Sequence, residues 1–269
     1  MRFKNREIIL RSAAGAALLL SASAWAGIDN SKHDFGTGGG AQGAGGAGQS
    51  TEICVYCHTP HGANTALSAP LWNRPAGSAT YQRYSSLGSA TLDGEEIAVG
   101  SVSLACLSCH DGTQAMDVVI NAPGSGGYNA SGAQISTATV GSMTGGVVPN
   151  LGTDLRDDHP ISIEYAGGSC SGTTADCTPS AATGDPDFVV AQYELINTQN
   201  QWWVDTTGGT ANKREKTDMI LYPRTFTGGS GPSVECGSCH DPHSDTAQPV
   251  SFMRISNTNS AVCLACHTK

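Results

Sequence analysis

The chain has 269 residues, of which 34 are glycine and 10 are cysteine, whereas only 6% are aromatic. It carries 14 Lys and Arg against 23 Asp and Glu, a formal net charge of −9 at pH 7. Such an acidic chain is a poor partner for nucleic acid or for an anionic lipid surface. With so few large apolar side chains it also cannot build a large hydrocarbon core, so we expect other apolar material to fill the interior.

Residues 1–26 are typical of an export signal. A basic stretch (residues 2–11) precedes a short apolar run (13–20), and residues 24–26 read Ala-Trp-Ala, which matches a cleavage site. The run is shorter than the ~20 residues that span a bilayer, which argues against a membrane anchor. The mature chain is expected to begin at Gly27 and to hold 10 Lys and Arg against 22 Asp and Glu. We therefore expect an exported protein, extracellular or on the cell surface, with the periplasm as the alternative.

Residues 27–50 form an N-terminal arm that contains His33 and then a run of glycine and alanine. This composition is typical of a flexible linker. The reach of His33 is therefore expected to depend on the linker, and residues 51–269 are expected to form the folded domain.

The pattern around Cys54, Cys57 and His58 is C-x-x-C-H, the attachment signature of a c-type haem. In this chemistry the two thiols bind the macrocycle, and the histidine that follows is held under the iron as its proximal ligand. Three further copies are present: Cys106, Cys109 and His110; Cys236, Cys239 and His240; Cys263, Cys266 and His267. Zinc sites place their second pair of ligands at other spacings. The sequence therefore predicts four covalently bound haem c groups, whose macrocycles supply the missing core.

The mature chain contains eight histidines, and four of them are the predicted proximal ligands. The other four are His33, His61, His159 and His243. Four remaining histidines for four remaining iron positions is the count that a uniformly bis-histidine tetrahaem protein requires. Methionine ligation is the alternative, with the following candidates: Met116, Met143, Met219 and Met253.

The spacing of the distal histidines restricts which haem each one can bind. His61 and His243 lie three residues beyond a proximal histidine, so on a helical turn their Cβ atoms lie about 5–6 Å from it. Such neighbours cannot reach around one macrocycle, so each is expected to bind a different, adjacent haem. The predicted pairs of distal and proximal histidines are the following: His61 with His110, His243 with His267, His159 with His58, and His33 with His240.

Cys170 and Cys177 remain after the haem cysteines are assigned, and Thr178 follows the second of them. They are therefore not a variant haem motif. In an exported protein, a local disulfide that closes a surface loop is the natural interpretation.

The fold class expected from these patterns is a mostly irregular multihaem c-type cytochrome, with short helices around the haem motifs and a few short strands. Short helices are expected at residues 54–61, 104–111 and 213–222, weak strand character at 96–99, and loop or meandering β-structure at 121–146. Residues 188–196 are compatible with a strand or an amphipathic helix. Trp72 is expected to have a packing role.

The order of motifs resembles a known family. The segments concerned are Lys32-His33-Asp34, the haem motifs at 54–61, 106–113, 236–243 and 263–267, and the Asp-Asp-His-Pro stretch at 157–160. Together they are similar to the extracellular tetrahaem c-type cytochromes that polymerise into conductive filaments in metal-reducing bacteria. The resemblance implies a chain of bis-histidine haems through the subunit, and it implies that His33 binds a haem of the neighbouring subunit in a homo-polymer.

The function expected is electron transfer between redox partner proteins and an extracellular acceptor, with no catalytic residues. A soluble periplasmic tetrahaem shuttle is the alternative, and an intramolecular His33 ligand would favour it. A multihaem oxidoreductase is a further alternative, but it needs an open iron position, and the ligand count closes all four.

Overall fold

The computed structural model describes residues 27–36, 52–116, 118–122, 141–143, 149–209, 213–244 and 252–269. The predicted export signal (1–26) and the glycine-rich linker (37–50) lie outside these residues. Within them, no helix is long and apolar enough to cross a membrane.

The described helices are all short. The α-helices are α2 (Ser101–His110), α3 (Cys236–Cys239) and α4 (Ala261–Cys266), and the 3-10 helices are η2 (Ile53–Tyr56), η3 (Tyr84–Leu87), η4 (Tyr165–Gly168) and η5 (Thr258–Ser260). Much of the remaining described chain is turn and loop, so the mostly irregular fold with short helices around the haem motifs is confirmed.

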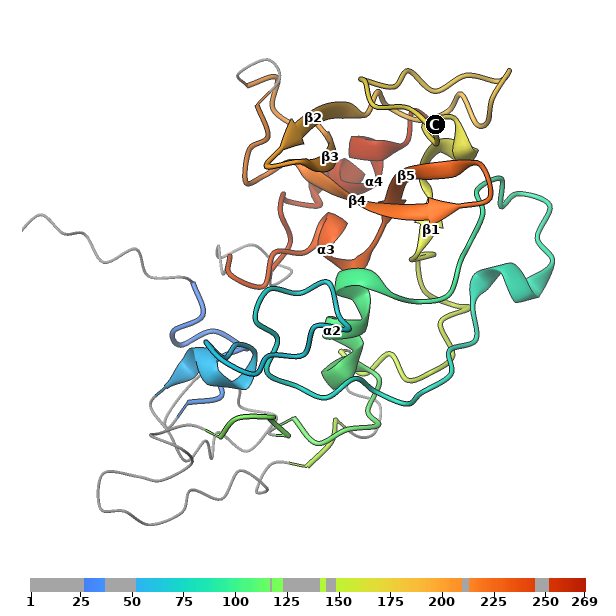
Figure 1. Ribbon diagram of the computed structural model, residues 1–269. Helices are drawn as coiled ribbons and strands as arrows, with labels where there is room; N and C mark the ends of the chain where they lie inside the picture. The colour runs from blue at the N-terminus through green and yellow to red at the C-terminus, as the bar shows by residue number, and fades with distance from the viewer. Residues whose placement is uncertain are drawn as a thin grey trace, which may run out of the picture.

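A five-stranded antiparallel sheet is the largest regular element, and the sequence analysis did not predict it. The strands are β1 (Ile163–Glu164), β2 (Gln192–Ile196), β3 (Gln199–Val204), β4 (Met219–Phe226) and β5 (Gly229–Val234). Their order in the sheet is β1-β5-β4-β3-β2. The β2–β3 hairpin turns at Asn197 and Thr198, which both have positive φ as a type I′ turn requires. Figure 1 shows the sheet at one end of the molecule, with α3 and α4 close to it.

The main hydrophobic core packs against this sheet. Trp202 of β3 pairs with Leu221 of β4, and both side chains are fully buried together with Met219. The thiols of Cys239 and Cys266 are partly buried against this cluster. The third and fourth haem motifs therefore pack against the sheet and its core.

A smaller hydrophobic cluster lies between the first motif and α2. It contains Leu67, Trp72 and Ala105, and Cys57 is partly buried against it. Trp72 is 9% exposed, so its predicted packing role is confirmed.

Some predicted elements differ from the structure. The short helix predicted at 213–222 is wrong, because β4 begins at Met219 and its first three residues are buried in the sheet. Within residues 188–196, for which a strand or an amphipathic helix was expected, Gln192–Ile196 form strand β2. Glu96 makes only an isolated bridge to Ile163. Most of the predicted loop at 121–146 lies outside the described residues.

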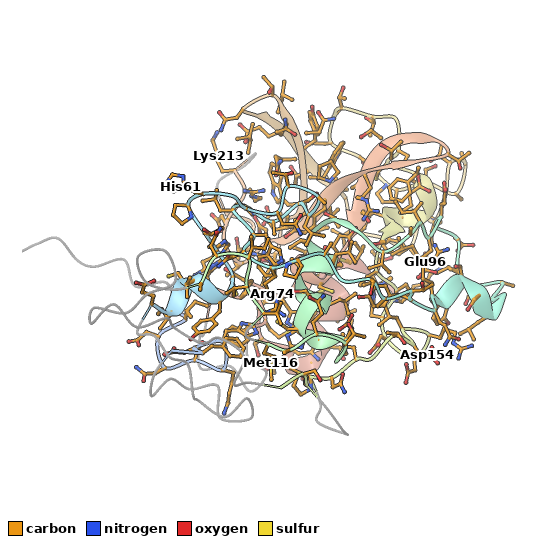
Figure 2. All side chains as sticks on the ribbon, turned by 60° about the horizontal axis from the view of Figure 1, so that its bottom comes forward. His61, Arg74, Glu96, Met116, Asp154 and Lys213 are labelled. Atoms are coloured by element: carbon orange, nitrogen blue, oxygen red, sulfur yellow. A yellow bond between two sulfur atoms is a disulfide. The ribbon has the colours of Figure 1, made fainter. Side chains whose placement is uncertain are left out.

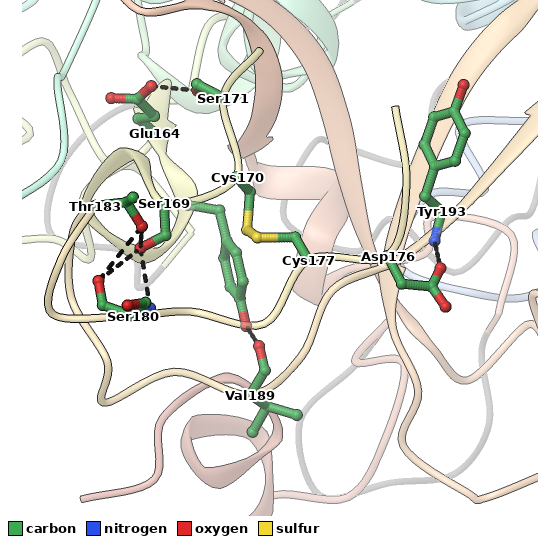
Figure 3. The surroundings of a disulfide bond; sticks show 11 residues. Glu164, Ser169, Cys170, Ser171, Asp176, Cys177, Ser180, Thr183, Val189 and Tyr193 are labelled. Carbon is green, nitrogen blue, oxygen red and sulfur yellow. Dashed lines mark hydrogen bonds between the residues drawn. A yellow bond between two sulfur atoms is a disulfide. The ribbon is translucent and has the colours of Figure 1, made fainter. Parts of the chain in front are cut away.

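The predicted disulfide between Cys170 and Cys177 is present, with a Cα–Cα distance of 5.5 Å (Figure 3). Cys170 is fully buried, and both sulfurs belong to the main core. The closed loop is held to β2, because Asp176 accepts a hydrogen bond of 2.8 Å from the Tyr193 amide. The disulfide thus joins a surface loop to the core that supports the last two haem motifs.

Replacing both cysteines of this disulfide with serine should lower the free energy of unfolding by about 2–3 kcal/mol, the loop-entropy cost for so short a loop. Denaturant unfolding of the haem-loaded protein measures this change, and the haem content of the folded protein should stay the same. An unchanged midpoint would contradict a stabilising role for the bridge.

Candidate haem-binding site

Each C-x-x-C-H motif lies on one helical turn. Motifs 1 to 4 are defined here by their first cysteines, Cys54, Cys106, Cys236 and Cys263. Motif 1 begins in η2, motif 2 ends α2, motif 3 is α3, and motif 4 ends α4. Two cysteines three residues apart lie on the same face of a helical turn, so both thiols can reach one macrocycle.

Motifs 1, 3 and 4 are held in the same way by a segment from elsewhere in the chain, which we call the return segment. In each, the carbonyl oxygen of the second cysteine accepts a hydrogen bond from a return-segment amide. The donors are Asn73 to Cys57 (2.8 Å), Arg254 to Cys239 (2.9 Å) and Val189 to Cys266 (2.9 Å). The proximal histidine then makes a β-bridge to the preceding return residue: His58 to Trp72, His240 to Met253 and His267 to Phe188. The backbone therefore changes from helix to extended conformation at the proximal histidine.

Motif 2 is held differently. The helix α2 includes His110, and the Asp111 amide continues it by donating to the Leu107 carbonyl. The carbonyl of His110 itself accepts a hydrogen bond from the Leu151 amide. His110 is thus fixed by a helix end and a crossing loop.

Several histidines are oriented by backbone carbonyls of prolines. The Nδ1 atoms of His58 and His110 each lie 2.7 Å from such a carbonyl, that of Pro70 and that of Pro149. His159 Nδ1 lies 2.9 Å from the carbonyl of its neighbour Pro160. A ring that donates from Nδ1 leaves Nε2 free as a lone-pair donor to a metal. This is the protonation state that an axial ligand of haem iron requires.

The structure brings two pairs of rings to the separation of axial ligands. Two imidazoles that bind one iron from opposite sides, each through a metal–nitrogen bond of about 2 Å, have ring centres roughly 6 Å apart. The rings of His58 and His243 are 5.9 Å apart. Those of His33 and His110 are 6.1 Å apart. His58 with His243, and His110 with His33, are therefore the ring pairs that could hold a haem iron between them.

The surroundings of His33 keep its imidazole neutral. Its ring stacks on Phe252 at 4.1 Å. Burial, aided by the nearby His110, lowers the pKa of His33 to about 4. A neutral imidazole is the form that binds a metal. In this structure His33 thus lies on its own chain, at the second motif.

The other histidines are less fully paired. Burial lowers the pKa of His267, and the nearby His159 adds to this shift, which places His159 beside motif 4. His61 is exposed and points away from the body of the molecule (Figure 2). His61 and His240 are the two that remain.

These positions differ from the pairing expected from the sequence. That expectation placed His243 with motif 4, His33 with motif 3 and His159 with motif 1. It placed His243 on the haem of the following motif because spacing excluded only the haem of its own motif. In the structure motif 3 folds back toward motif 1, and the Gly27 amide of the arm donates to the His243 carbonyl at 2.9 Å.

The attachment thiols of consecutive motifs lie close enough to influence one another, and we call this succession of motifs the row. Burial raises the pKa of Cys57 to about 12, and the neighbouring Cys109 adds to this rise. A hydrogen bond between the thiols of Cys106 and Cys236 raises the pKa of Cys106 and lowers that of Cys236. Burial raises the pKa of Cys239, with a smaller contribution from Cys263. Motif 1 is therefore next to motif 2, motif 2 next to motif 3, and motif 3 next to motif 4.

A buried carboxylate fixes the contact between motifs 2 and 3. Glu235 caps α3 and pairs with Arg224 at 2.7 Å. The Ser103 hydroxyl of α2 donates to Glu235 at 2.5 Å and accepts from the Cys236 amide at 3.0 Å. Burial raises the pKa of Glu235, against the opposing effects of the Ser103 hydrogen bond and the Arg224 charge. Ser103 thus joins the helix of motif 2 to the first cysteine of motif 3.

The surface near the motifs suits an apolar macrocycle with carboxylate substituents. Large apolar side chains that are exposed next to the motifs include Leu71, Leu151 and Leu264. Among the described residues, the buried Trp72 indole nitrogen, close to His58, has no hydrogen-bond partner. Buried donors normally have an acceptor, which a haem propionate would supply. The donor set and its surroundings fit haem.

Comparison with known proteins agrees with this site. Residues 231–269 match a family model described as a doubled CXXCH motif. A search of curated protein sequences found no match. The matched segment contains motifs 3 and 4, so the chain carries the paired motif of multihaem c-type cytochromes. The eight motif cysteines are free thiols in the structure, as haem attachment requires.

The sequence analysis did not identify the residues that hold the motifs. Asn73 and Arg74 are fully buried, and both hydrogen-bond to the haem motifs. The sequence contains a weak signal for these segments. In motifs 1 and 3, a pair of large apolar or aromatic residues precedes the residue whose amide donates to the second cysteine.

If His243 and His58 bind the same haem, combining His243→Ala with the loss of one haem motif gives a distinctive result. His243→Ala should leave the motif 1 haem five-coordinate and produce a high-spin signal in the optical and paramagnetic resonance spectra. In a background that lacks motif 1 (Cys54→Ala and Cys57→Ala), the same substitution should add no high-spin haem. In the matched background that lacks motif 4 (Cys263→Ala and Cys266→Ala), it should still add one. The reverse pattern would assign His243 to motif 4.

Proposed function

We propose that this protein transfers electrons through four covalently bound haem c groups, each with two histidine ligands. The observation that supports this most strongly is the closeness of consecutive motifs: Asn73 and Arg74 join motif 1 to motif 2, and Ser103 joins motif 2 to motif 3. It sets adjacent haems close together, as electron transfer from one to the next requires. Bound haem supplies one-electron chemistry, and two histidine ligands give a lower potential than histidine with methionine.

The chain's own residues have three tasks in this proposal. The cysteines fix the macrocycles, the proximal histidines are positioned by the return segments or by α2, and the distal histidines close the second axial position. The proposed pairs of axial ligands are His58 with His243, His110 with His33, and His267 with His159. His61 completes the set with His240. Two tight ligands on every iron leave no position for a substrate, so we propose a carrier and not an enzyme.

The export signal and the acidic mature chain favour a location outside the cytoplasm. We propose that the electrons pass to an extracellular acceptor. The contact of His33 with its own chain supports a discrete tetrahaem carrier.

A filament of this protein is the second candidate function, and the feature that favours it is the N-terminal arm. The arm contacts the domain through the Gly27 amide, the His33 ring and Phe35, whose ring lies 5.8 Å from that of Tyr56. It is joined to the domain by residues 37–50, which are rich in glycine. The same contacts made on a neighbouring copy would be a domain swap, which costs little because the interface is unchanged. Through it, His33 would bind the motif 2 haem of the next subunit.

Electron counting tests the carrier directly. The purified protein should accept four electrons per chain from a low-potential donor and deliver four to ferric oxide particles. The variant lacking motif 4 should accept and deliver three. Nitrite and hydroxylamine should not be consumed by the reduced protein, and steady turnover of either would contradict the proposal.

A His33→Ala variant tests the assembly. It should keep four covalent haems, with one of them no longer bis-histidine, because the thioether bonds do not depend on His33. Electron microscopy of material released from producing cells gives the second result. Filaments in the wild type that are absent from His33→Ala support the swapped arm. Filaments in both would show that His33 does not link subunits, and monomer-sized particles in both would support the discrete carrier.

A further inference from the structure

Arg74 is a buried arginine in the interior of the protein. Its side chain is fully buried, and it lies in the middle of the molecule (Figure 2). Buried charges are usually paired with an opposite charge. Among the described residues, no carboxylate forms an ion pair with Arg74.

The guanidinium is instead held by backbone carbonyls. It donates to the carbonyls of Ser108 (2.9 Å), Ala115 (2.8 Å) and Met116 (2.6 Å), and to the Ser108 hydroxyl (3.1 Å). These acceptors satisfy its hydrogen bonds but do not cancel its charge. The nearby carboxylate of Asp111 is bonded to Tyr81 and Thr113.

This cation is located between motifs 1 and 2. Ser108 lies between the two cysteines of motif 2. The residue before the arginine, Asn73, donates from its amide to the Cys57 carbonyl and from its side chain to the Val55 carbonyl, both in motif 1.

We propose that Arg74 is a positioning residue whose buried charge raises the reduction potentials of the first two haems, that of motif 2 most. Ferric haem carries one more positive charge than ferrous haem, so a fixed cation close by destabilises the oxidised form. In a buried site this interaction is strong and little screened by salt. The inference rests on the proposed haem electron transfer. It adds that electrons are favoured on the haems of motifs 1 and 2, because their reduction potentials are raised.

Charge and hydrogen bonding at this position can be separated by two substitutions. Arg74→Gln removes the charge, whereas Arg74→Lys keeps the charge but loses the planar fork of donors. Arg83→Gln is the control, because Arg83 also donates to a backbone carbonyl, that of Glu96, outside the motifs. All variants are purified with covalent haem, and each haem potential is measured by a spectroelectrochemical titration.

The expected result is that Arg74→Gln moves one or two of the four potentials downward, while Arg74→Lys and Arg83→Gln leave all four in place. Removing motif 2 (Cys106→Ala and Cys109→Ala) should eliminate the larger of the shifts. Unchanged potentials in Arg74→Gln would overturn the proposal. So would an equal fall in Arg74→Lys, because that would indicate a structural effect, and the lysine variant decides this even if the glutamine variant fails to fold.

This outcome is distinguishable from failure of the proposed function. If the protein does not bind four low-spin haems, electron counting fails in the wild type before any variant is compared. If it does bind them and the potentials ignore Arg74, only the tuning role is lost.

Discussion

The backbone hydrogen bond to the second cysteine of a haem motif is the interaction on which the rest of the structure depends. It occurs in three of the four motifs, each time from a return segment that lies outside the motif in the sequence. It ends the turn and extends the backbone at the proximal histidine. The backbone itself thereby fixes the position from which the proximal imidazole projects.

The two halves of the motif row are supported in different ways. Motifs 3 and 4 rest on the sheet and its core around Trp202, to which the disulfide adds a covalent closure. Motifs 1 and 2 rest on a much smaller cluster around Trp72 and on the hydrogen bonds of Asn73 and Arg74. The first half therefore depends more on polar contacts and on bound haem for its stability. Ser103 and Glu235 join the halves at the contact of motifs 2 and 3.

Features that depend on residues close together in the sequence could be predicted, and features that depend on distant residues could not. The C-x-x-C-H motifs, the short helices that carry them and the Cys170–Cys177 disulfide are local patterns, and the structure contains all of them. The sheet was missed because its strands contain residues of low strand propensity, such as Pro223 paired with Pro232, and are stabilised by packing and not by pattern.

The pairing of histidines could not be read from spacing either. The eight histidines were found by counting, but the ring that lies 5.9 Å from His243 is that of His58, 185 residues earlier in the chain. That contact depends on how motif 3 folds back onto motif 1. The roles of Asn73 and Arg74 were missed for the same reason, since their acceptors lie in two separate motifs and the residues themselves belong to neither.

We propose that two histidines hold every iron of this protein. The electron paramagnetic resonance spectrum of the fully oxidised protein, integrated against its haem content, tests this proposal. We expect low-spin ferric signals alone, which sum to four haems per chain. A high-spin signal of one haem or more in the unmodified protein would show an open iron position and would rule out two histidines on every iron.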